Sequence, residues 1–249
     1  LTQQNASPSR PNILLGITGS VAAIKGPELA VRLAVNANVR ILLTQGGASF
    51  WSKAKVYNPT AWDEMSELCQ PTTRPNSDIN AEEVDTRGAR GVISMHTATA
   101  EWEGWNQIGD SVLHIHLRDW ADILLISPLS AHTLAKIANG LCDDTLSCVA
   151  RAWDYGHGGR RGKPLLLAPA MNTAMWDHPL TQHHLKTIQD FWNGTRHPNC
   201  EVRVIAPQVK SLACGEVGNG AMASVDHIAL QVEQSLRGLE RSKTIALDE

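Results

Sequence analysis

The chain has 249 residues, of which 43% are hydrophobic and 19% are charged, and its formal net charge is −3. A chain of this length can bury one substantial core, so we expect a single domain with insertions. The charge balance offers no basic surface for nucleic acid or an anionic membrane. We find no apolar run near the roughly 20 residues of a membrane span and no signal-peptide core in residues 1–10.

The cysteines indicate a reducing environment. They are odd in number and lack both close CxxC spacing and a paired framework: Cys69, Cys142, Cys148, Cys200 and Cys214. Reduced thiols fit this pattern better than disulfides. We therefore expect a soluble, cytoplasmic protein.

Residues 11–17 predict a short apolar strand, and residues 18–25 form a turn into a helix that runs to about residue 35. A strand, a turn containing Gly19 and Ser20, and a helix start together suit a phosphate group. The turn lacks the GxGxxG spacing, so a dinucleotide is not implied, and these residues can equally serve as helix caps. Residues 39–44 predict a second strand, which completes a right-handed βαβ unit.

The regular pattern is lost between residues 53 and 110. Residues 71–78 and 85–91 are polar and loop-like, which predicts a mobile or surface insertion without chemistry of its own. Trp102 and Trp105 near its end are expected to anchor it to the body of the protein.

Order returns at residues 112–122, followed by a strand at 123–126 and a helix from Leu134 that stops at Asn139 and Gly140. His114 and His116 could provide a general base, metal ligands or a helix surface. The surface reading is the commonest for such a pair, and a metal needs more ligands than this spacing supplies.

Asp143 or Asp144 is expected to cap a helix that runs through Trp153. The apolar run 164–168 then predicts a parallel strand buried on both faces, ended by Pro169. Asn172 should therefore lie at the carboxyl edge of the sheet, where open α/β folds bind ligands. The simpler alternative is that Asn172 or Thr173 caps the next helix.

After a helix at about 179–192, residues 201–206 predict the last strand. The glycine-dense stretch around Cys214 predicts a flexible substrate flap at about residues 207–224. A small apolar residue in a surface turn is the alternative reading for Cys214. Asp226 is expected to cap a terminal helix that reaches Ser235 or Leu239.

The alternation of strands and helices predicts a doubly wound, Rossmann-like or flavodoxin-like α/β fold. We expect five or six parallel strands with helices on both faces. Because the polar stretches follow strands, they should converge on one edge of the sheet.

Five stretches together resemble the motif series of the phosphopantothenoylcysteine decarboxylase family, within the homo-oligomeric flavin-containing cysteine decarboxylases. They are Gly-Ser-Val-Ala-Ala-Ile-Lys at 19–25, His-Ile-His-Leu at 114–117, Pro-Leu-Ser-Ala-His-Thr at 128–133, Pro-Ala-Met-Asn-Thr-Ala-Met-Trp at 169–176 and Ala-Cys-Gly-Glu at 213–216. The resemblance covers the chain except for the termini, residues 53–110 and residues 155–163.

This resemblance implies bound FMN, a homotrimer with the flavin at the subunit interface, and a step in coenzyme A biosynthesis. In the family, the flavin oxidises the cysteinyl thiol of 4'-phosphopantothenoylcysteine to a thioaldehyde, carbon dioxide leaves, and the enethiol is reduced to 4'-phosphopantetheine. His114 would be the catalytic base, Asn172 would hold the carboxylate, and Cys214 would donate a proton. Met175, Ala213 and Gly215 would join Asn172 in binding substrate. The residues expected around FMN are Gly19, Ser20, Val21, Thr44, Gly46, Ser130, Ala131, His132, Thr133 and Ala170.

Two positions depart from the family pattern. His132 replaces the usual Asn, and His116 replaces the usual Glu. An imidazole at 132 is bulkier than an amide and can carry charge, so we expect the replacement to bear on flavin affinity or interface geometry. The change at 116 alters a supporting contact.

Two alternatives to the active decarboxylase remain. One is a non-catalytic flavoprotein that regulates a protein phosphatase, as fungal relatives do, or a subunit of a hetero-oligomeric decarboxylase. Such regulators carry a long acidic tail, whereas this sequence ends Leu-Asp-Glu. The other is a flavoprotein acting on peptidyl cysteine or prenylating flavin, against which the Ala-Cys-Gly-Glu stretch argues.

Overall fold

The computed structural model describes residues 10–69, 90–103, 105–156, 161–193, 200–211 and 217–245. Its centre is a parallel sheet of six strands in the order β3-β2-β1-β4-β5-β6. The strands are β1 (Asn12–Ile17), β2 (Asn38–Leu43), β3 (Ile93–His96), β4 (Ile123–Leu129), β5 (Leu165–Pro169) and β6 (Val202–Val204). The chain winds outward from β1 in one direction and from β4 in the other. This is the doubly wound fold that the sequence predicts.

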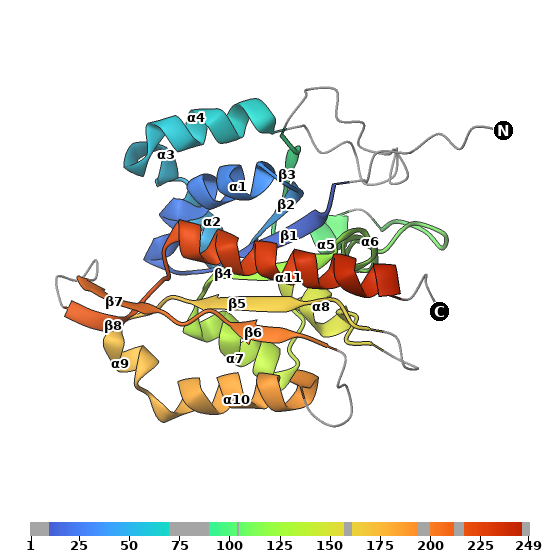
Figure 1. The fold of residues 1–249 in the computed structure, drawn as a ribbon. Coiled ribbons are helices and arrows are strands. Elements are labelled where there is room, and N and C mark those ends of the chain that lie inside the picture. Colours follow the sequence, from blue (N-terminus) through green and yellow to red (C-terminus); the bar gives the residue numbers. More distant parts are fainter. Residues whose placement is uncertain are drawn as a thin grey trace.

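Two helical layers cover the sheet (Figure 1). One layer contains α1 (Gly26–Ala34), α4 (Pro59–Leu68) and α11 (Val225–Ile245), preceded by the short helices η1 (Val21–Lys25), α2 (Gln45–Trp51) and α3 (Ala54–Tyr57). The other contains α6 (Leu113–Trp120), α7 (Ala131–Asn139), α8 (Thr145–Ala152) and α10 (Pro179–Asn193). The one-turn helices α5 (Ala100–Glu103) and α9 (Thr173–Trp176) lie in connections.

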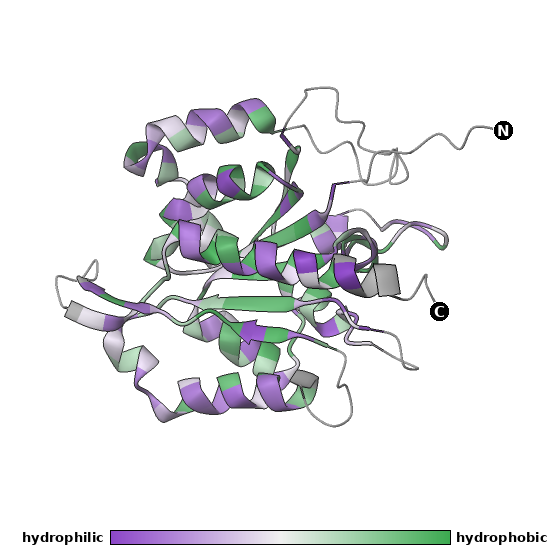
Figure 2. Cartoon of the chain, viewed as in Figure 1, coloured by the Kyte–Doolittle hydropathy of each residue, from purple (hydrophilic) through white to green (hydrophobic). Residues whose placement is uncertain are grey.

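Alternate residues of the central strands supply two separate cores. Ile13 and Leu15 of β1 pack with Leu29 of α1 and Ile228 of α11, whereas Leu14 packs with Leu134 of α7 in the other core. All seven residues of β4 are buried, as expected of a strand covered on both faces. Figure 2 shows the apolar residues gathered on the sheet and on the inner faces of the helices.

The region 53–110 is more regular than predicted. It contributes α3, α4, α5 and the edge strand β3, which pairs with β2 from Ile93 beside Val39 to His96 beside Leu42. The prediction that this region lacks elements is therefore wrong for the residues described. Strand β3 was missed because it has only four residues and ends in Met95 and His96. Residues 71–78 and 85–89 of the predicted loops lie outside the described residues.

The described part of the predicted flap, residues 207–211 and 217–224, contains an antiparallel hairpin. Strands β7 (Gln208–Ser211) and β8 (Val217–Ala221) form a second, two-stranded sheet, so residues 201–206 do not hold the last strand of the chain. Gly220 packs closely on the loop after β5, where its carbonyl oxygen accepts a hydrogen bond from the N–H of Met171 at 3.0 Å. A β carbon at 220 would collide with the Met171 carbonyl oxygen.

Two boundaries differ from expectation. Strand β4 continues through Ser127, Pro128 and Leu129, because a register irregularity against β5 between Ile126 and Leu129 accommodates the proline. Helix α11 begins at Val225, and its cap is Ser224, whose Oγ accepts from the N–H of His227 at 3.2 Å; Asp226 lies inside the first turn. Among the described helices, none combines the length and the apolarity that crossing a membrane requires.

Candidate active site

The loops after four parallel strands meet at one edge of the sheet, and each places a polar side chain at a helix start. Ser20, Thr44, Ser130 and Asn172 follow β1, β2, β4 and β5 and cap η1, α2, α7 and α9. The caps bind the backbone N–H groups of Ala22, Gly47, Thr133 and Met175 at 3.4, 3.1, 3.3 and 2.8 Å. The predicted convergence of these stretches is confirmed for the loops described.

Thr18 joins the two halves of the sheet where the winding direction reverses. Its buried hydroxyl donates to the carbonyl oxygen of Pro128 at 2.7 Å and accepts from the N–H of Ser130 at 2.7 Å. The loops after β1 and β2 also touch through backbone, since a β carbon on Gly46 would lie 3.0 Å from the Cα of Gly19. This reversal is the position at which doubly wound folds bind ligands.

A first cavity of about 620 Å³ opens at this reversal, within the size range of ligand sites. It brings together nine of the residues predicted from the sequence, with apolar walls from Phe50 and Met222. These nine are Gly19, Ser20, Val21, Ser130, Ala131, His132, Ala170, Asn172 and Met175. Because α7 leaves the N–H groups of its first turn without helical partners, this cavity holds donors suited to an anion.

A second cavity of about 660 Å³ adjoins the first and shares Gly19, Ser130 and His132 with it. Thr44, Gly46 and Thr133, also predicted around the cofactor, line this one. Its far wall is formed by the residues after β3, by exposed Trp102, and by Lys136 with its acidic partners.

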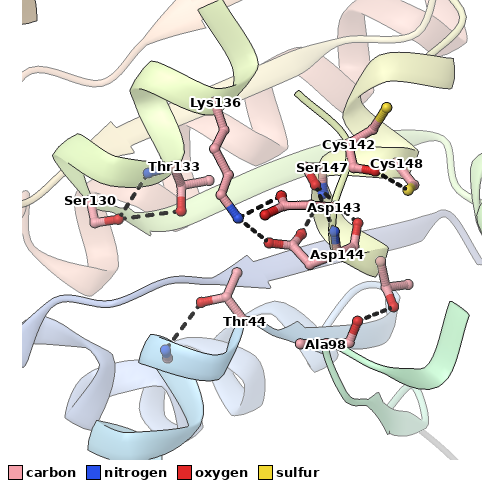
Figure 3. A network of polar contacts seen from close by, with 12 residues as sticks. Thr44, Ala98, Ser130, Thr133, Lys136, Cys142, Asp143, Asp144, Ser147 and Cys148 are labelled. Atoms are coloured by element: carbon pink, nitrogen blue, oxygen red, sulfur yellow. Dashed lines mark hydrogen bonds and ion pairs between the residues drawn. The ribbon is translucent and has the colours of Figure 1, made fainter. Parts of the chain in front are cut away.

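The acidic wall is a compact ion-pair network (Figure 3). The Nζ of Lys136 lies 2.6 Å from a carboxylate oxygen of Asp143 and 3.0 Å from one of Asp144. Burial acts against the charged amine, but the hydrogen bonds to both carboxylates outweigh it and raise the pKa of Lys136. Asp144 also caps α8 in a reciprocal box with Ser147, which fixes the network to the helix start.

Two lysines in the first cavity were not among the predicted site residues. Lys25, at the end of η1, and Lys210, on β7, both line it. Burial, and then the charge of Lys210, lowers the pKa of Lys25, so the two ammonium groups act on one another. Lys210 was missed because only the hairpin brings β7 beside the loops of the main sheet.

His114 lines neither cavity. It lies in the first turn of α6, where its Nδ1 is 2.6 Å from Oε1 of Glu101 and its backbone N–H donates to Oε2 of the same carboxylate at 3.1 Å. Glu101 sits in the region to which no chemistry was assigned. No local pattern predicts this pair, because α5 and α6 meet only through tertiary packing.

His116 belongs to a different cluster from His114. Its Nε2 is 3.3 Å from Nη1 of Arg40, and the Arg40 guanidinium stacks 4.1 Å from the ring centroid of Trp120. Burial, and then the charge of Arg40, lowers the pKa of His116, and the same causes lower that of His96 to about 4. The predicted supporting role of residue 116 thus corresponds to a contact with strand β2.

The predicted residues Ala213, Cys214 and Gly215 lie outside the described residues. The strands on either side of them do reach the site, since Gln208, Lys210, Gly220 and Ala221 line the first cavity. Asn219 of β8 is tied to Asp177 after α9 by a hydrogen bond of 3.0 Å.

The fold and the cavities together define a doubly wound α/β protein with its candidate ligand site at the reversal of strand order. The sequence profile of the Flavoprotein family matches residues 1–237. Phosphopantothenoylcysteine decarboxylase from Malus domestica is 41% identical over 221 residues, covering 89% of this chain and 81% of its own, and that from Mus musculus is 35% identical, covering 90% and 86%. The chain therefore belongs to the flavoprotein family, in its phosphopantothenoylcysteine decarboxylase branch.

Solved structures agree with this assignment. A phosphopantothenoylcysteine decarboxylase mutant complexed with pantothenoylaminoethenethiol superposes with a TM-score of 0.68 at 38% identity, over 92% of this chain and all of that one. An FMN binding protein superposes with a TM-score of 0.64 at 38% identity, over 91% and 96%.

Proposed function

We propose that the protein catalyses the FMN-dependent decarboxylation of 4'-phosphopantothenoylcysteine to 4'-phosphopantetheine, a step of coenzyme A biosynthesis. The observation that carries this proposal is the first cavity. It brings together Gly19, Ser130, Asn172 and other motif residues where the strand order reverses. The names and the extent of the related proteins support it.

The residues present fit FMN. The N–H groups at the start of α7 and the hydroxyl of Ser20 suit its phosphate, while Val21, Ala170 and Met222 offer apolar walls for a flat ring. Gly19 and Gly46 approach each other so closely that a side chain on either would meet the backbone of the other. Bound FMN would supply a two-electron acceptor that returns the electrons once carbon dioxide has left.

The anionic substrate fits the same cavity. Lys25 and Lys210 place two ammonium groups there, which suits the substrate phosphate. The Oδ1 of Asn172 is occupied by its helix cap, so its NH₂ group would face the substrate and donate to the carboxylate.

Proton transfers are assigned to His114 and Cys214. The Nε2 of His114 would take the proton of the substrate thiol, and the Sγ of Cys214 would return a proton during formation of the product. Since His114 lines neither cavity of its own chain, we propose a homotrimer in which His114 serves the cavity of a neighbouring copy. Exposed apolar side chains around α5 and α6, Trp102, Trp105, Ile108 and Ile115, support an interface there.

We also infer a cytoplasmic location. Among the described cysteines, Cys142, Cys148 and Cys200 are reduced thiols, and the last two are buried. Free buried thiols agree with a reducing compartment.

Two measurements test the function. Purified protein should show the absorption spectrum of bound FMN and should release carbon dioxide from 4'-phosphopantothenoylcysteine, with 4'-phosphopantetheine as the product by mass spectrometry. Protein that takes up no FMN on reconstitution, or that binds FMN and leaves the substrate unchanged, contradicts the proposal.

Complementation tests the shared site. His114→Asn and Cys214→Ser should each make no 4'-phosphopantetheine, whereas the two variants refolded together should recover part of the activity, because mixed trimers contain some sites with both native residues. Molar mass by light scattering should equal three chains. A monomer, or mixtures as inactive as either variant, would rule out the shared site.

A further inference from the structure

The carboxylate of Glu101 is enclosed, and within the part of the chain that the structure describes its hydrogen bonds are all to His114. Its side chain is 5% exposed, and its two oxygens are contacted by two groups of His114: Nδ1 of the ring at 2.6 Å and the backbone N–H at 3.1 Å. Burying a carboxylate is costly unless hydrogen bonds or charges compensate for it. Here the compensation comes from His114, so the position of the carboxylate and the orientation of the ring depend on each other.

This two-point contact fixes the imidazole. The backbone N–H anchors one carboxylate oxygen, and the other oxygen then sets where Nδ1 can lie. An ionised carboxylate only accepts hydrogen bonds, so the nitrogen facing it must carry the proton. In the neutral ring, Nε2 is then the nitrogen with a free lone pair, and 26% of the His114 side chain remains exposed.

Glu101 itself is held by a second element. Its backbone N–H donates to Oγ1 of Thr145, the first residue of α8, at 3.2 Å. The single hydrogen of the same hydroxyl points toward the carbonyl oxygens of Thr97 and Ala98, at 3.1 and 3.0 Å, and both residues line the second cavity. The Thr145 hydroxyl therefore connects the backbone of Glu101 to the backbone of the cavity wall.

We propose that Glu101 is a positioning residue for His114, holding the imidazole in the tautomer protonated on Nδ1 so that Nε2 acts as the base. The inference rests on the proposed function, in which His114 accepts the substrate proton. It adds a residue from α5 to the machinery of that reaction.

A metal site is the competing reading of this cluster. One ligand atom from each of Glu101, His114 and Cys148 lies within 4.8 Å of the others. However, Nδ1 and Oε1 already bind each other, and the Cys148 thiol donates to the carbonyl oxygen of Cys142 at 3.4 Å. Burial, and then the charge of Glu101, raises the pKa of Cys148 to about 11, which keeps it a neutral thiol, whereas metals bind the thiolate.

Glu101 also caps α6, whose own N-cap residue, Val112, makes no side-chain cap. Glu101→Gln separates the two roles. The glutamine oxygen can still accept the backbone N–H of His114, which preserves the cap. Its NH₂ group would then face Nδ1 and favour the opposite tautomer, with the proton on Nε2. A purely structural role would survive this substitution, and a positioning role would not.

The first test reads the tautomer without using activity. Nitrogen NMR of histidine-labelled full-length protein, at a pH where the ring is neutral, should show His114 protonated on Nδ1; the signal is identified by its loss in His114→Asn. Glu101→Gln should shift the proton toward Nε2. Wild-type protein with the proton on Nε2 would overturn the proposal, whatever the activity measurements give.

The second test is kinetic. Glu101→Gln should lower kcat by roughly 10²- to 10⁴-fold with KM nearly unchanged and FMN still bound, the range expected when a catalytic histidine loses its proper tautomer. Glu103→Gln is the matched control, because Glu103 is exposed on the same helix and binds Thr99 at 2.6 Å.

The outcomes separate the two proposals. Unchanged kcat in Glu101→Gln, in a wild type that decarboxylates the substrate, removes the positioning role and leaves the proposed function intact. A wild type that releases no carbon dioxide refutes the proposed function, and the NMR result still decides whether Glu101 sets the tautomer of His114.

Discussion

The Oδ1 of Asn172 accepts a hydrogen bond from the backbone N–H of Met175 at 2.8 Å, while the same side chain lines the first cavity. The two readings of Asn172 from the sequence, as a helix cap and as a polar residue in a crevice, are therefore both correct. The oxygen serves the helix, and the NH₂ group remains for a ligand.

Asn172→Asp should separate these roles. Asp caps helices as well as Asn does, so the thermal midpoint should stay within a few degrees of wild type. Decarboxylation should fall about 10²-fold, because a second carboxylate would face the substrate carboxylate where an amide donated to it. Asn172→Ala removes the cap as well as the amide, so it should lose activity and also about 1 kcal/mol of stability. Full activity in Asn172→Asp would remove residue 172 from substrate binding.

His132→Asn should strengthen FMN binding. His132 is exposed and lines both cavities, and an amide restores the smaller family residue with one donor and one acceptor group. One added hydrogen bond corresponds to a factor of about two to ten in Kd. Quenching of FMN fluorescence during titration of the apoprotein gives this value. Weaker binding by His132→Asn would show that the imidazole itself contacts the cofactor.

Lys25→Met and Lys210→Met should each raise KM for the phosphorylated substrate by about tenfold or more, since each removes a charge-assisted contact. The effect should shrink for a substrate that lacks the phosphate and should fall with added salt. Lys186→Met is the control, because Lys186 lies on α10, where it pairs with Asp190 at 2.5 Å, and lines neither cavity. An equal rise in KM for both substrates would show that the lysines do not bind the substrate phosphate.

Stability should fall as the pH drops from about 6.5 toward 4. The pKa of His96 is lowered to about 4 in the folded protein by burial and by Arg40, whereas an unfolded histidine has a pKa near 6.5. Above about pH 6.5 both states are neutral, so nothing is lost. Below about pH 6.5 the unfolded chain binds the proton before the folded chain does, and the free energy of unfolding falls by an amount on the order of 1 to 3 kcal/mol. The thermal midpoint should depend less on pH across this range in His96→Gln than in the wild type. His227→Gln, which replaces an exposed histidine, should keep the wild-type dependence on pH.

Cys214→Ser should stop the reaction after carbon dioxide has left. Serine is a far weaker proton donor than a thiol, so the enethiol, two hydrogens short of 4'-phosphopantetheine, should accumulate. Mass spectrometry distinguishes the two products. Wild-type yields of 4'-phosphopantetheine would exclude Cys214 as the donor.

The sequence predicts the parts of this structure that depend on local pattern. The apolar runs of β1, β4 and β5 identify buried parallel strands, and the polar residues after them converge as expected. Ser224 shows the limit of such reasoning, because Asp226, two residues later, is an equally good cap by type and only the backbone geometry decides between them.

Features that depend on tertiary pairing were missed. Glu101 has no sequence signal of its own, since its meaning comes from the contact between α5 and α6. Strand β3 has a mixed composition and exists because β2 offers it a free edge. Lys210 reaches the site only because β7 and β8 fold back as a hairpin.

Gly19, Ser130 and His132 stand in the walls of both cavities. Two molecules bound in the two cavities would therefore contact the same three residues. The dissociation constant of each molecule would then depend on whether the other is bound. If a ligand in the second cavity changes the affinity of the first cavity for its own ligand by some factor, the ligand in the first cavity changes the affinity of the second by the same factor.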